Sequence, residues 1–449
     1  MSEPIISVSG LRGTIGEQLT PVVAANYVAA WATTLPKGRI VVSRDGRQSG
    51  AMLGSAVCSS LQAHGFDVID LGVAATPTVG VMVRTEQAVG GVQISASHNP
   101  RPYNGLKLFN SNGRVLPRSE GERVLDAYRR RASAWVSVEN LGTFQQLADP
   151  HAKHLELLLS RIDTSPIQNQ TIPVLLDSNH GAGSLLGQRL LSTLGCHTKI
   201  LGGEPNGDFA HPPEPLAENL QDVCAEVKAG GFQVGFCQDP DADRLAIIDE
   251  RGMYIGEELT LALCLMQVLP SNPGTVVTNC ATSSLAKFVA SANRSQVRQS
   301  AVGEANVADL MLAENAVFGG EGNGGPIDPQ VGFVRDSFVG MCRILHLLAT
   351  TGQAVSQLVS QLPPLTMYKD KIDMSAESLP EFFALLQHAM PDAKASMPDG
   401  LKLEWEHQWL LVRGSNTEPI VRLIAEAVDL ASAKALCNQA RALVNLPQV

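Results

Sequence analysis

Short apolar runs alternate with helical patterns through the first two thirds of the chain, and this alternation limits the fold more than any other feature of the sequence. In the first unit, helices are predicted from Thr20-Pro21, where a proline takes the first helical position, and over 51–64 and 78–85. The strands predicted between and after these helices cover 39–43, 66–71 and 89–94. Strands separated by helices favour a parallel sheet with helices on both faces.

The same alternation recurs twice more, so we expect three α/β units in succession. The second unit has a helix that ends near Leu194 and strands over 172–176, 234–237 and 245–249. The third has a helix over 257–269 and strands over 275–278 and 316–318. The 449 residues are enough for roughly three domains of about 150 residues, or for four if they are small.

The last part of the chain has a different pattern. After Pro363-Pro364, helices are predicted over 379–390 and 431–444, and strands over 401–406, 409–413 and 420–426. Consecutive strands with a helix on either side are typical of a small α+β domain. We therefore expect domains over 1–149, 150–250, 251–364 and 365–449.

The composition excludes several classes of protein. The 34 Lys and Arg against 44 Asp and Glu give a net charge of −10, whereas nucleic-acid-binding proteins are basic. The longest apolar stretch, 259–269, is far shorter than the ~20 residues that span a bilayer, and residues 1–4 lack the features of a signal peptide. The eight cysteines form no CxxC pair, which argues against structural zinc or disulfides. We expect a cytoplasmic enzyme with no nucleic-acid or membrane partner.

Polar loops follow several of the predicted strands, where ligands bind in open α/β sheets. The first is Ser95-Ala96-Ser97-His98-Asn99-Pro100, in which Pro100 prevents a helix from continuing through Asn99. Its hydroxyls and histidine are consistent with a nucleophile or phosphoacceptor, and equally with an ordinary Ser/Asn turn. Lys107 follows shortly afterwards and, taken alone, has the pattern of a surface charge.

The second loop is Asp239-Pro240-Asp241-Ala242-Asp243-Arg244, between two predicted strands. Three carboxylates so close together repel one another unless a cation lies among them. Hard oxygen ligands favour Mg²⁺ or Ca²⁺, and three of them leave coordination positions for a phosphate oxygen. We therefore predict a metal site here rather than a solvated acidic turn.

Two further loops carry fewer charges. Residues 319–325 include five glycines and one carboxylate, Glu321, which can accept hydrogen bonds from hydroxyls, although a mobile linker has the same composition. Residues 413–419 combine Arg413 with hydroxyl, amide and glycine groups, and Arg422 follows; such a set suits a phosphate. Near the start, Arg12 lies between Gly10 and Gly13.

The four loops in this order resemble those of the α-D-phosphohexomutase superfamily, over essentially the whole chain. The resemblance implies four domains around a central cleft, namely three similar α/β domains with mixed sheets and a small α+β domain at the C-terminus. It also implies an isomerase that carries a phosphoserine and binds one Mg²⁺ per subunit, with a hexose 1,6-bisphosphate as activator and intermediate.

The resemblance also implies a role for each matching residue. Those at the reacting group are the phosphoserine Ser97, the candidate acid/base Lys107, His98, Arg12 and Arg244. The implied metal ligands are Ser97, Asp239, Asp241 and Asp243. The implied substrate-binding residues are Glu321, Asn323, Arg413, Ser415, Asn416, Thr417 and Arg422. For Lys107 to move a proton, we expect neighbouring cations such as Arg12 to lower its pKa towards neutrality.

Two loops depart from the commonest family patterns. Pro240 and Ala242 stand where many relatives have glycine. Asn323 stands where many relatives have serine or another residue, and Gly325 stands where many have histidine. The segment Ile94–Pro100 resembles the form common in glucosamine-type members, so we expect interconversion of glucosamine 6-phosphate and glucosamine 1-phosphate. The alternatives are a phosphomannomutase/phosphoglucomutase, a phosphatase that releases phosphate to water, and a non-catalytic sugar-phosphate-binding protein. The oligomeric state stays open.

Overall fold

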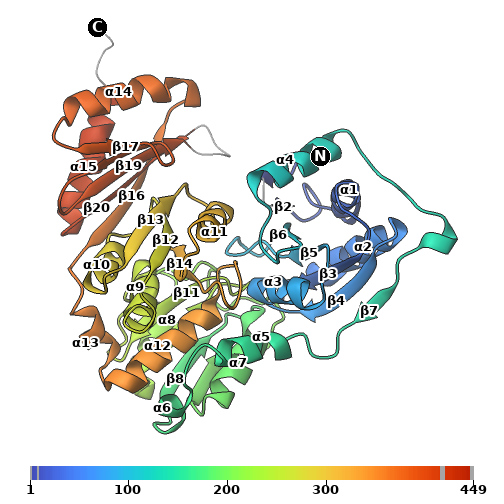
Figure 1. The fold of residues 1–449 in the computed structure, drawn as a ribbon, viewed down its shortest axis with the longest axis horizontal. Coiled ribbons are helices and arrows are strands. Elements are labelled where there is room, and N and C mark those ends of the chain that lie inside the picture. The colour runs from blue at the N-terminus through green and yellow to red at the C-terminus, as the bar shows by residue number, and fades with distance from the viewer. Residues whose placement is uncertain (1–2, 8–9, 415–419, 445–449) are drawn as a thin grey trace.

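The computed structural model describes residues 3–7, 10–414 and 420–444, in which four β-sheets follow one another along the chain. Figure 1 shows the first sheet and its helices at the right, the second and third in the centre, and the fourth at the upper left. Three α/β domains with mixed sheets precede a smaller α+β domain, which confirms the predicted fold class. We number these domains I to IV.

Domain I contains a seven-stranded sheet in the order β1-β2-β6-β5-β3-β4-β7. Its strands are β1 (Ile5–Ser7), β2 (Gly10–Thr14), β3 (Arg39–Arg44), β4 (Asp67–Val73), β5 (Gly90–Ile94), β6 (Tyr103–Asn110) and β7 (Phe144–Gln146). Its helices are α1 (Pro21–Ala32), α2 (Gly50–Ala63), α3 (Thr76–Thr85), α4 (Arg118–Arg129) and the 3-10 turn η1 (Val138–Asn140).

Four strands of this sheet pair in parallel, as the alternation of strands and helices predicted, and the other three make the sheet mixed. Strands β5, β3, β4 and β7 run in one direction, whereas β6 returns antiparallel to β5, and β2 and β1 extend the sheet beyond it. The connection from β5 to β6 is too short for the crossover that a parallel pair requires. The asparagine and glycine at the start of β6 have low strand propensity and concealed it in the sequence.

Domains II and III each contain a four-stranded sheet with three parallel strands and one antiparallel edge strand. Domain II has β8 (Pro173–Asp177), β9 (His197–Leu201), β10 (Val234–Gln238), β11 (Leu245–Asp249), α5 (Ala152–Leu159), α6 (Ser165–Gln168), α7 (Gly183–Thr193) and α8 (Gln221–Gly230). Domain III has β12 (Thr275–Asn279), β13 (Gln296–Ser300), β14 (Phe318–Glu321), β15 (Gly325–Ile327), α9 (Glu257–Val268), α10 (Leu285–Ala292), α11 (Glu304–Ala313), α12 (Ser337–Thr351) and α13 (Val355–Val359).

Domains II and III share one hydrophobic core. A single cluster of buried apolar side chains runs from β8 and β10 through α9, β12 and β14 to α12. Helix α12 packs against α9 and α6 and is buried along most of its length. Most apolar side chains of domains I and IV form separate clusters, and Ala75 and Val81 of domain I join the shared core. Among the residues described, no helix has the length and apolar character that crossing a membrane requires.

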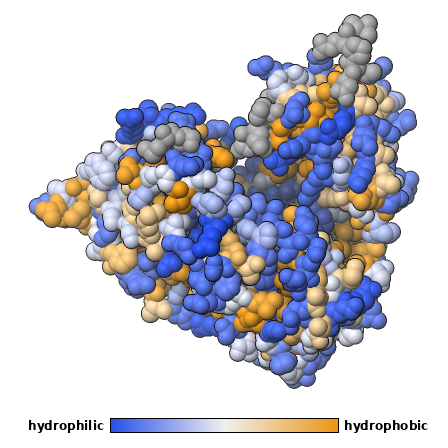
Figure 2. Space-filling model, turned by 180° about the vertical axis from the view of Figure 1, so that it is seen from behind, coloured by the Kyte–Doolittle hydropathy of each residue, from blue (hydrophilic) through white to orange (hydrophobic). Residues whose placement is uncertain are grey.

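Domain IV is an antiparallel sheet in the order β16-β20-β19-β18-β17 with two helices. Its elements are β16 (Thr366–Asp373), β17 (Lys394–Ser396), β18 (Leu401–Glu404), β19 (Trp409–Gly414), β20 (Ile420–Ala427), α14 (Leu379–Ala389), α15 (Leu430–Val444) and the 3-10 turn η2 (Ala376–Ser378). Strands β16 and β17 were not predicted. Figure 2 shows a hollow between domains I and IV. Each domain boundary predicted from the sequence falls between two of the sheets.

Candidate active site

The loop that carries Ser97 leaves the end of β5, and Ser97 has a left-handed backbone conformation (φ 48°). This conformation costs energy for residues other than glycine and is typical of functional sites. The Ser95 hydroxyl accepts a hydrogen bond from the Ser97 N–H (2.9 Å) and donates one to Asp45 (2.6 Å). The loop is therefore held in a strained shape, with Ser97 only 3% exposed.

Arg47, which belongs to no recognisable sequence motif, fixes the same loop. Its guanidinium donates hydrogen bonds to four carbonyl oxygens, those of Ser97 (2.6 Å), Asn99 (2.6 Å), Pro100 (3.0 Å) and Tyr103 (2.9 Å). It also pairs with Asp45 at 3.1 Å. Asp45 and Arg47 follow β3, which is parallel to and adjacent to β5. Their place after a parallel strand was the signal that could have revealed them.

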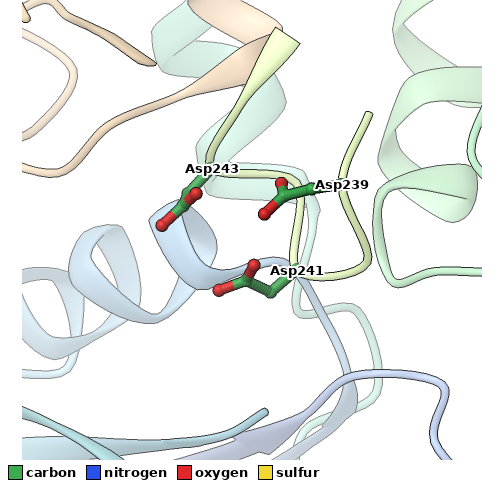
Figure 3. Close-up of side chains that lie close together, drawn as sticks. All are labelled: Asp239, Asp241 and Asp243. Carbon is green, nitrogen blue, oxygen red and sulfur yellow. The ribbon is translucent and has the colours of Figure 1, made fainter. Parts of the chain in front are cut away.

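The three carboxylates of the metal loop lie between β10 and β11 and extend to the same side of the loop (Figure 3). One oxygen from each lies within 4.8 Å of the others, and all three side chains are fully buried. Ser97 Oγ donates a hydrogen bond to Asp239 Oδ2 (2.8 Å). A loop of domain II and a loop of domain I therefore meet in one site.

The donor set fits a divalent cation. Oδ1 of Asp241 and Oδ1 of Asp243 are buried without a hydrogen-bond partner among the described residues, which is costly unless a cation lies beside them. Burial, and then the charges of the other two aspartates, raises the pKa of Asp239 well above its ordinary value. Burial acts in the same direction on Asp243, but the charges of Arg335 and Lys107 outweigh it and lower the pKa of that carboxyl.

Lys107 lies on β6 and reaches the same carboxylates. Its Nζ is 2.9 Å from Asp243 Oδ2 and 3.2 Å from Asp241 Oδ2. Burial disfavours the charged amine, but the two carboxylates outweigh burial and raise the pKa of Lys107 above its ordinary value. The prediction that neighbouring cations lower this pKa is therefore wrong, because buried anions are the closest charges.

Arg12 contacts the serine loop, and His98 belongs to it. Arg12 is on β2, beside β6, and donates a hydrogen bond to Asn99 Oδ1 (3.0 Å). Nδ1 of His98 is 3.3 Å from Ser97 Oγ. Burial, and then the charges of Arg244 and Arg12, lowers the pKa of His98 to about 3. The imidazole is therefore neutral at pH 7.

Arg244 connects the metal loop to a segment that the sequence analysis left out. The backbone N–H of Arg244 donates a hydrogen bond to Asp239 Oδ1 (3.1 Å), and the Arg244 guanidinium lies 3.9 Å from Glu214 Oε1. The same Glu214 oxygen is 4.0 Å from His98 Nε2. Glu214 lies in the irregular segment between β9 and α8, whose proline-rich polar composition is that of a surface loop.

The glycine-rich segment forms a tight hairpin between β14 and β15. Glu321, at the end of β14, accepts hydrogen bonds from the Asn279 side chain (2.7 Å) and the Gly303 N–H (3.1 Å). Arg335 donates to its other carboxylate oxygen (2.9 Å). Asn323 Oδ1 is buried and has no hydrogen-bond partner within the described part of the chain, which leaves an acceptor for a ligand.

Gly325 has no room for a side chain. A Cβ at this position would lie 2.3 Å from Cδ of Arg335. Many members of the family that this chain resembles have histidine at this position. That side chain is incompatible with Arg335 in its observed place.

The expected phosphate loop belongs to domain IV. Arg413 is the register partner of Arg422 on the neighbouring strand β20 and pairs with Asp399 at 2.8 Å. Ser415, Asn416 and Thr417 lie outside the described residues. The structure brings Ser97, His98, Lys107, Arg12, Arg244, the aspartates and Glu321 into one connected site. Arg413 pairs with Asp399 and contacts none of these residues among those that the structure describes.

Family models match nearly the whole chain in four consecutive segments. They are described as phosphoglucomutase/phosphomannomutase alpha/beta/alpha domain I (residues 5–134), domain II (152–252), domain III (257–365) and the C-terminal domain (380–443).

The chain is 36% identical over 426 residues to a phosphoglucomutase/phosphomannomutase of Thermococcus kodakarensis, covering 93% of each chain. It is 32% identical over 435 residues to a "probable phosphoglucosamine mutase" of Methanopyrus kandleri, covering 96% of this chain and 95% of that one. A crystal structure of a phosphoglucomutase/phosphomannomutase family protein from Burkholderia thailandensis superposes with a TM-score of 0.85 at 25% identity, covering 98% of each chain.

Proposed function

The chain belongs to the phosphoglucomutase/phosphomannomutase family of phosphohexomutases, and from this premise we propose that it interconverts glucosamine 6-phosphate and glucosamine 1-phosphate. One observation carries the mechanism. Ser97 Oγ is buried and hydrogen-bonded to Asp239, within a group of three carboxylates that Lys107 also contacts. A nucleophilic oxygen, a metal site and a cation are thereby assembled around one point.

The phosphoryl group would pass from phosphorylated Ser97 to the free hydroxyl, O1 or O6, of the hexose monophosphate. The P–O bond to Ser97 breaks as the new P–O bond forms, which gives a 1,6-bisphosphate. After this intermediate turns over, its other phosphate returns to Ser97 and the isomeric monophosphate leaves. We assign Lys107 to proton transfer between the sugar hydroxyl and Ser97 Oγ, because its ammonium lies against the carboxylates that adjoin Ser97. These carboxylates raise the pKa of Lys107, and Mg²⁺ held by the same carboxylates would offset that effect.

Ser97 and the three aspartates would hold Mg²⁺, which when bound supplies positive charge that stabilises the transferring phosphoryl group. Glu321 would accept hydrogen bonds from the sugar hydroxyls. Arg413 and Arg422, with the loop between their strands, would hold the phosphate that is not reacting. Because the two monophosphates bind in opposite orientations, this phosphate site must accept both.

The identity of the sugar rests on fewer residues. The segment Ile94–Pro100 supports an amino sugar, as does the name of the relative from Methanopyrus kandleri. The name of the relative from Thermococcus kodakarensis favours a second candidate, a phosphomannomutase/phosphoglucomutase. Asn323 and Gly325 are the residues to examine for this choice, because they differ from the commonest pattern.

A ³¹P NMR time course tests the proposal. The Mg²⁺-loaded protein, primed with glucose 1,6-bisphosphate, is incubated separately with glucosamine 6-phosphate, mannose 1-phosphate and glucose 1-phosphate. We expect the glucosamine sample to reach a mixture of 1- and 6-phosphates fastest. Faster conversion of mannose or glucose phosphate would identify the second candidate, and net release of inorganic phosphate would identify a phosphatase.

The Ser97→Ala variant tests the phosphoserine. We expect turnover to fall by at least about 10³-fold, since the covalent step is lost, with little change in thermal stability. The matched control is Ser43→Ala, which removes a buried hydroxyl of the same domain that bonds only the carbonyls of Gly72 and Ala74 among the described residues. Near-normal activity of Ser97→Ala would contradict the assignment.

A further inference from the structure

Arg335 joins the metal loop to the sugar loop through one guanidinium. Its Nη2 lies 2.6 Å from Asp243 Oδ2, and its Nη1 lies 2.9 Å from Glu321 Oε2. Its Nε is 3.8 Å from Glu304 Oε2. The side chain is 8% exposed, so water does little to screen these charges. Each of the two terminal guanidinium nitrogens of Arg335 is therefore paired with a carboxylate, and the two carboxylates belong to different loops.

The backbone around Arg335 is fixed on both sides. The Arg335 N–H donates a hydrogen bond to Glu304 Oε1 (2.8 Å), and the next residue, Asp336, caps α12. Asp336 also accepts from His154 Nε2 (2.8 Å), whose Nδ1 contacts the hydroxyl of Thr78 (2.9 Å). Domains I, II and III therefore all hold this segment. A side chain anchored in this way is positioned before any ligand binds.

The next hydroxyl on the segment reaches the metal loop as well. Ser337 Oγ donates a hydrogen bond to the carbonyl of Ala242 (2.7 Å), and Ala242 has a left-handed conformation (φ 55°). Arg335 and Ser337 thus bind the metal loop at two adjacent residues, Asp243 and Ala242.

The sugar loop also has a shape that accommodates Arg335. The arginine side chain packs against Cα of Gly325, where any Cβ would collide with it. Arg335 is therefore built into the hairpin that carries Glu321.

We propose that Arg335 is a positioning residue that couples occupation of the metal loop to occupation of the sugar loop. The proposal rests on the proposed function in one respect, namely that the ligand of the sugar loop is a hexose phosphate. When a sugar hydroxyl donates a hydrogen bond to Glu321, the hydrogen bond from Arg335 to that carboxylate is weakened. The guanidinium charge then acts more strongly on Asp243, or moves with Glu321, and in both cases the metal ligand responds.

Such coupling is reciprocal. If the sugar phosphate changes the affinity for the metal by some factor, the metal changes the affinity for the sugar phosphate by the same factor. Factors of about 5 to 150 are typical of coupled sites. A residue that only stabilises the fold would change the amount of active protein and leave this factor unaltered.

The test measures binding of Mn²⁺, as the probe for the metal, by electron paramagnetic resonance with and without glucosamine 6-phosphate. We expect the wild type to bind Mn²⁺ at least about fivefold more tightly or more weakly with the sugar phosphate present. In Arg335→Met this factor should fall to about one. In Arg335→Lys it should be reduced, because a single ammonium cannot bridge both carboxylates.

The matched control is Arg343→Lys. Arg343 is also a buried arginine of domain III, but its guanidinium pairs with Asp328 (2.6 Å) and donates to Gln267 (3.0 Å) rather than to Asp243 or Glu321. We expect this variant to keep the wild-type factor. If Arg335→Met does not fold, as judged by circular dichroism, Arg335→Lys decides the question.

The proposal would be overturned if Arg335→Lys or Arg335→Met kept the wild-type change in Mn²⁺ affinity on adding the sugar phosphate. It would also be overturned if the wild type showed no such change. The proposed function is decided separately by turnover of the wild type in the NMR assay. A mutase without coupling would overturn only the role of Arg335, whereas a protein that couples the ligands without turnover would overturn only the proposed function.

Discussion

Two residues of the site have backbone conformations that glycine adopts more easily. Ser97 and Ala242 both have positive φ, on the serine loop and the metal loop respectively. Ala242 stands where many relatives have glycine, and the structure explains that preference. In this chain the strain is held by neighbours, Ser337 at Ala242 and Arg47 at Ser97. Strain that other residues maintain is a common way to aim a reacting group.

The importance of Arg47 can be tested by replacing it with lysine. A lysine keeps the charge but cannot donate to four carbonyls from one planar fork, so the serine loop should lose its position. We expect kcat to fall by about 10²-fold, the loss typical of a misplaced reacting group, with a smaller effect on KM. Steady-state kinetics measure both. Arg39→Lys, at the exposed start of β3, which precedes Arg47 in the chain, is the control. A wild-type kcat in Arg47→Lys would refute this role.

The motif residues were predictable, but the residues that hold them were not. Clusters such as three aspartates or a serine beside a histidine stand out in a sequence because the chemistry needs several groups close together. Arg47 and Arg335 each act alone through contacts with distant segments, and a single arginine in a polar segment has the pattern of a surface charge. Local sequence carries no information about those contacts.

At the scale of elements, the sequence predicted the buried parallel strands best. Strands β3, β5, β8 and β10 are continuous apolar runs, which is the pattern of strands covered on both faces. The antiparallel strands β6, β15 and β16 were missed, because they contain glycine, proline or alternating charges. The site depends on two of them, since β6 carries Lys107 and β15 closes the sugar hairpin.

The strand β18 carries a buried lysine into the interface between domains III and IV. Lys402 is 1% exposed, donates a hydrogen bond to the carbonyl of Cys280 (2.9 Å) and lies over the ring of Trp409. Burial lowers the pKa of Lys402 to about 8, against the opposing charge of Glu404. The folded protein therefore releases this proton at a lower pH than the unfolded chain does.

This difference predicts a pH-dependent stability. Between pH 8 and 10.5 the unfolded chain binds the Lys402 proton and the folded protein does not, so this residue's contribution to stability rises with pH. Across that window the contribution should increase by about 3 kcal/mol. We expect the stability of the wild type relative to Lys402→Met, measured by urea unfolding at pH 7.5 and pH 10.5, to rise accordingly. The exposed Lys434→Met is the control, and a pH-independent difference for Lys402→Met would count against the assignment.

At the scale of the whole molecule, the site lies where independently built parts meet. Domains II and III form one apolar core, whereas domain I and domain IV each have their own. The metal loop belongs to the shared core of II and III, but Ser97 and Lys107 come from domain I. The overall order of domains was predictable from the repeated strand–helix pattern. The contacts between domains were not, because they join side chains far apart in the sequence, both polar pairs such as Ser97 with Asp239 and apolar ones such as Cys280 with Trp409.

Metal binding should therefore stabilise the assembled molecule. Mg²⁺ at a hundred times its dissociation constant would add about 2.7 kcal/mol if it binds only the folded protein. We expect differential scanning fluorimetry to show a higher unfolding temperature with Mg²⁺ than with EDTA. The rise should vanish in Asp241→Asn, whose second oxygen is buried without a partner among the described residues, and persist in the exposed Asp208→Asn. An equal rise in Asp241→Asn would place the metal elsewhere.

The collision between Gly325 and Arg335 also has a consequence for how such a site can change over generations. A side chain at 325 requires Arg335 to leave its observed place, because a Cβ there would lie 2.3 Å from Cδ of the arginine. An arginine that has moved away or been replaced leaves Asp243 and Glu321 without their shared partner. The route between the two versions of the sugar loop therefore passes through a weakened enzyme, and each version tends to persist once established.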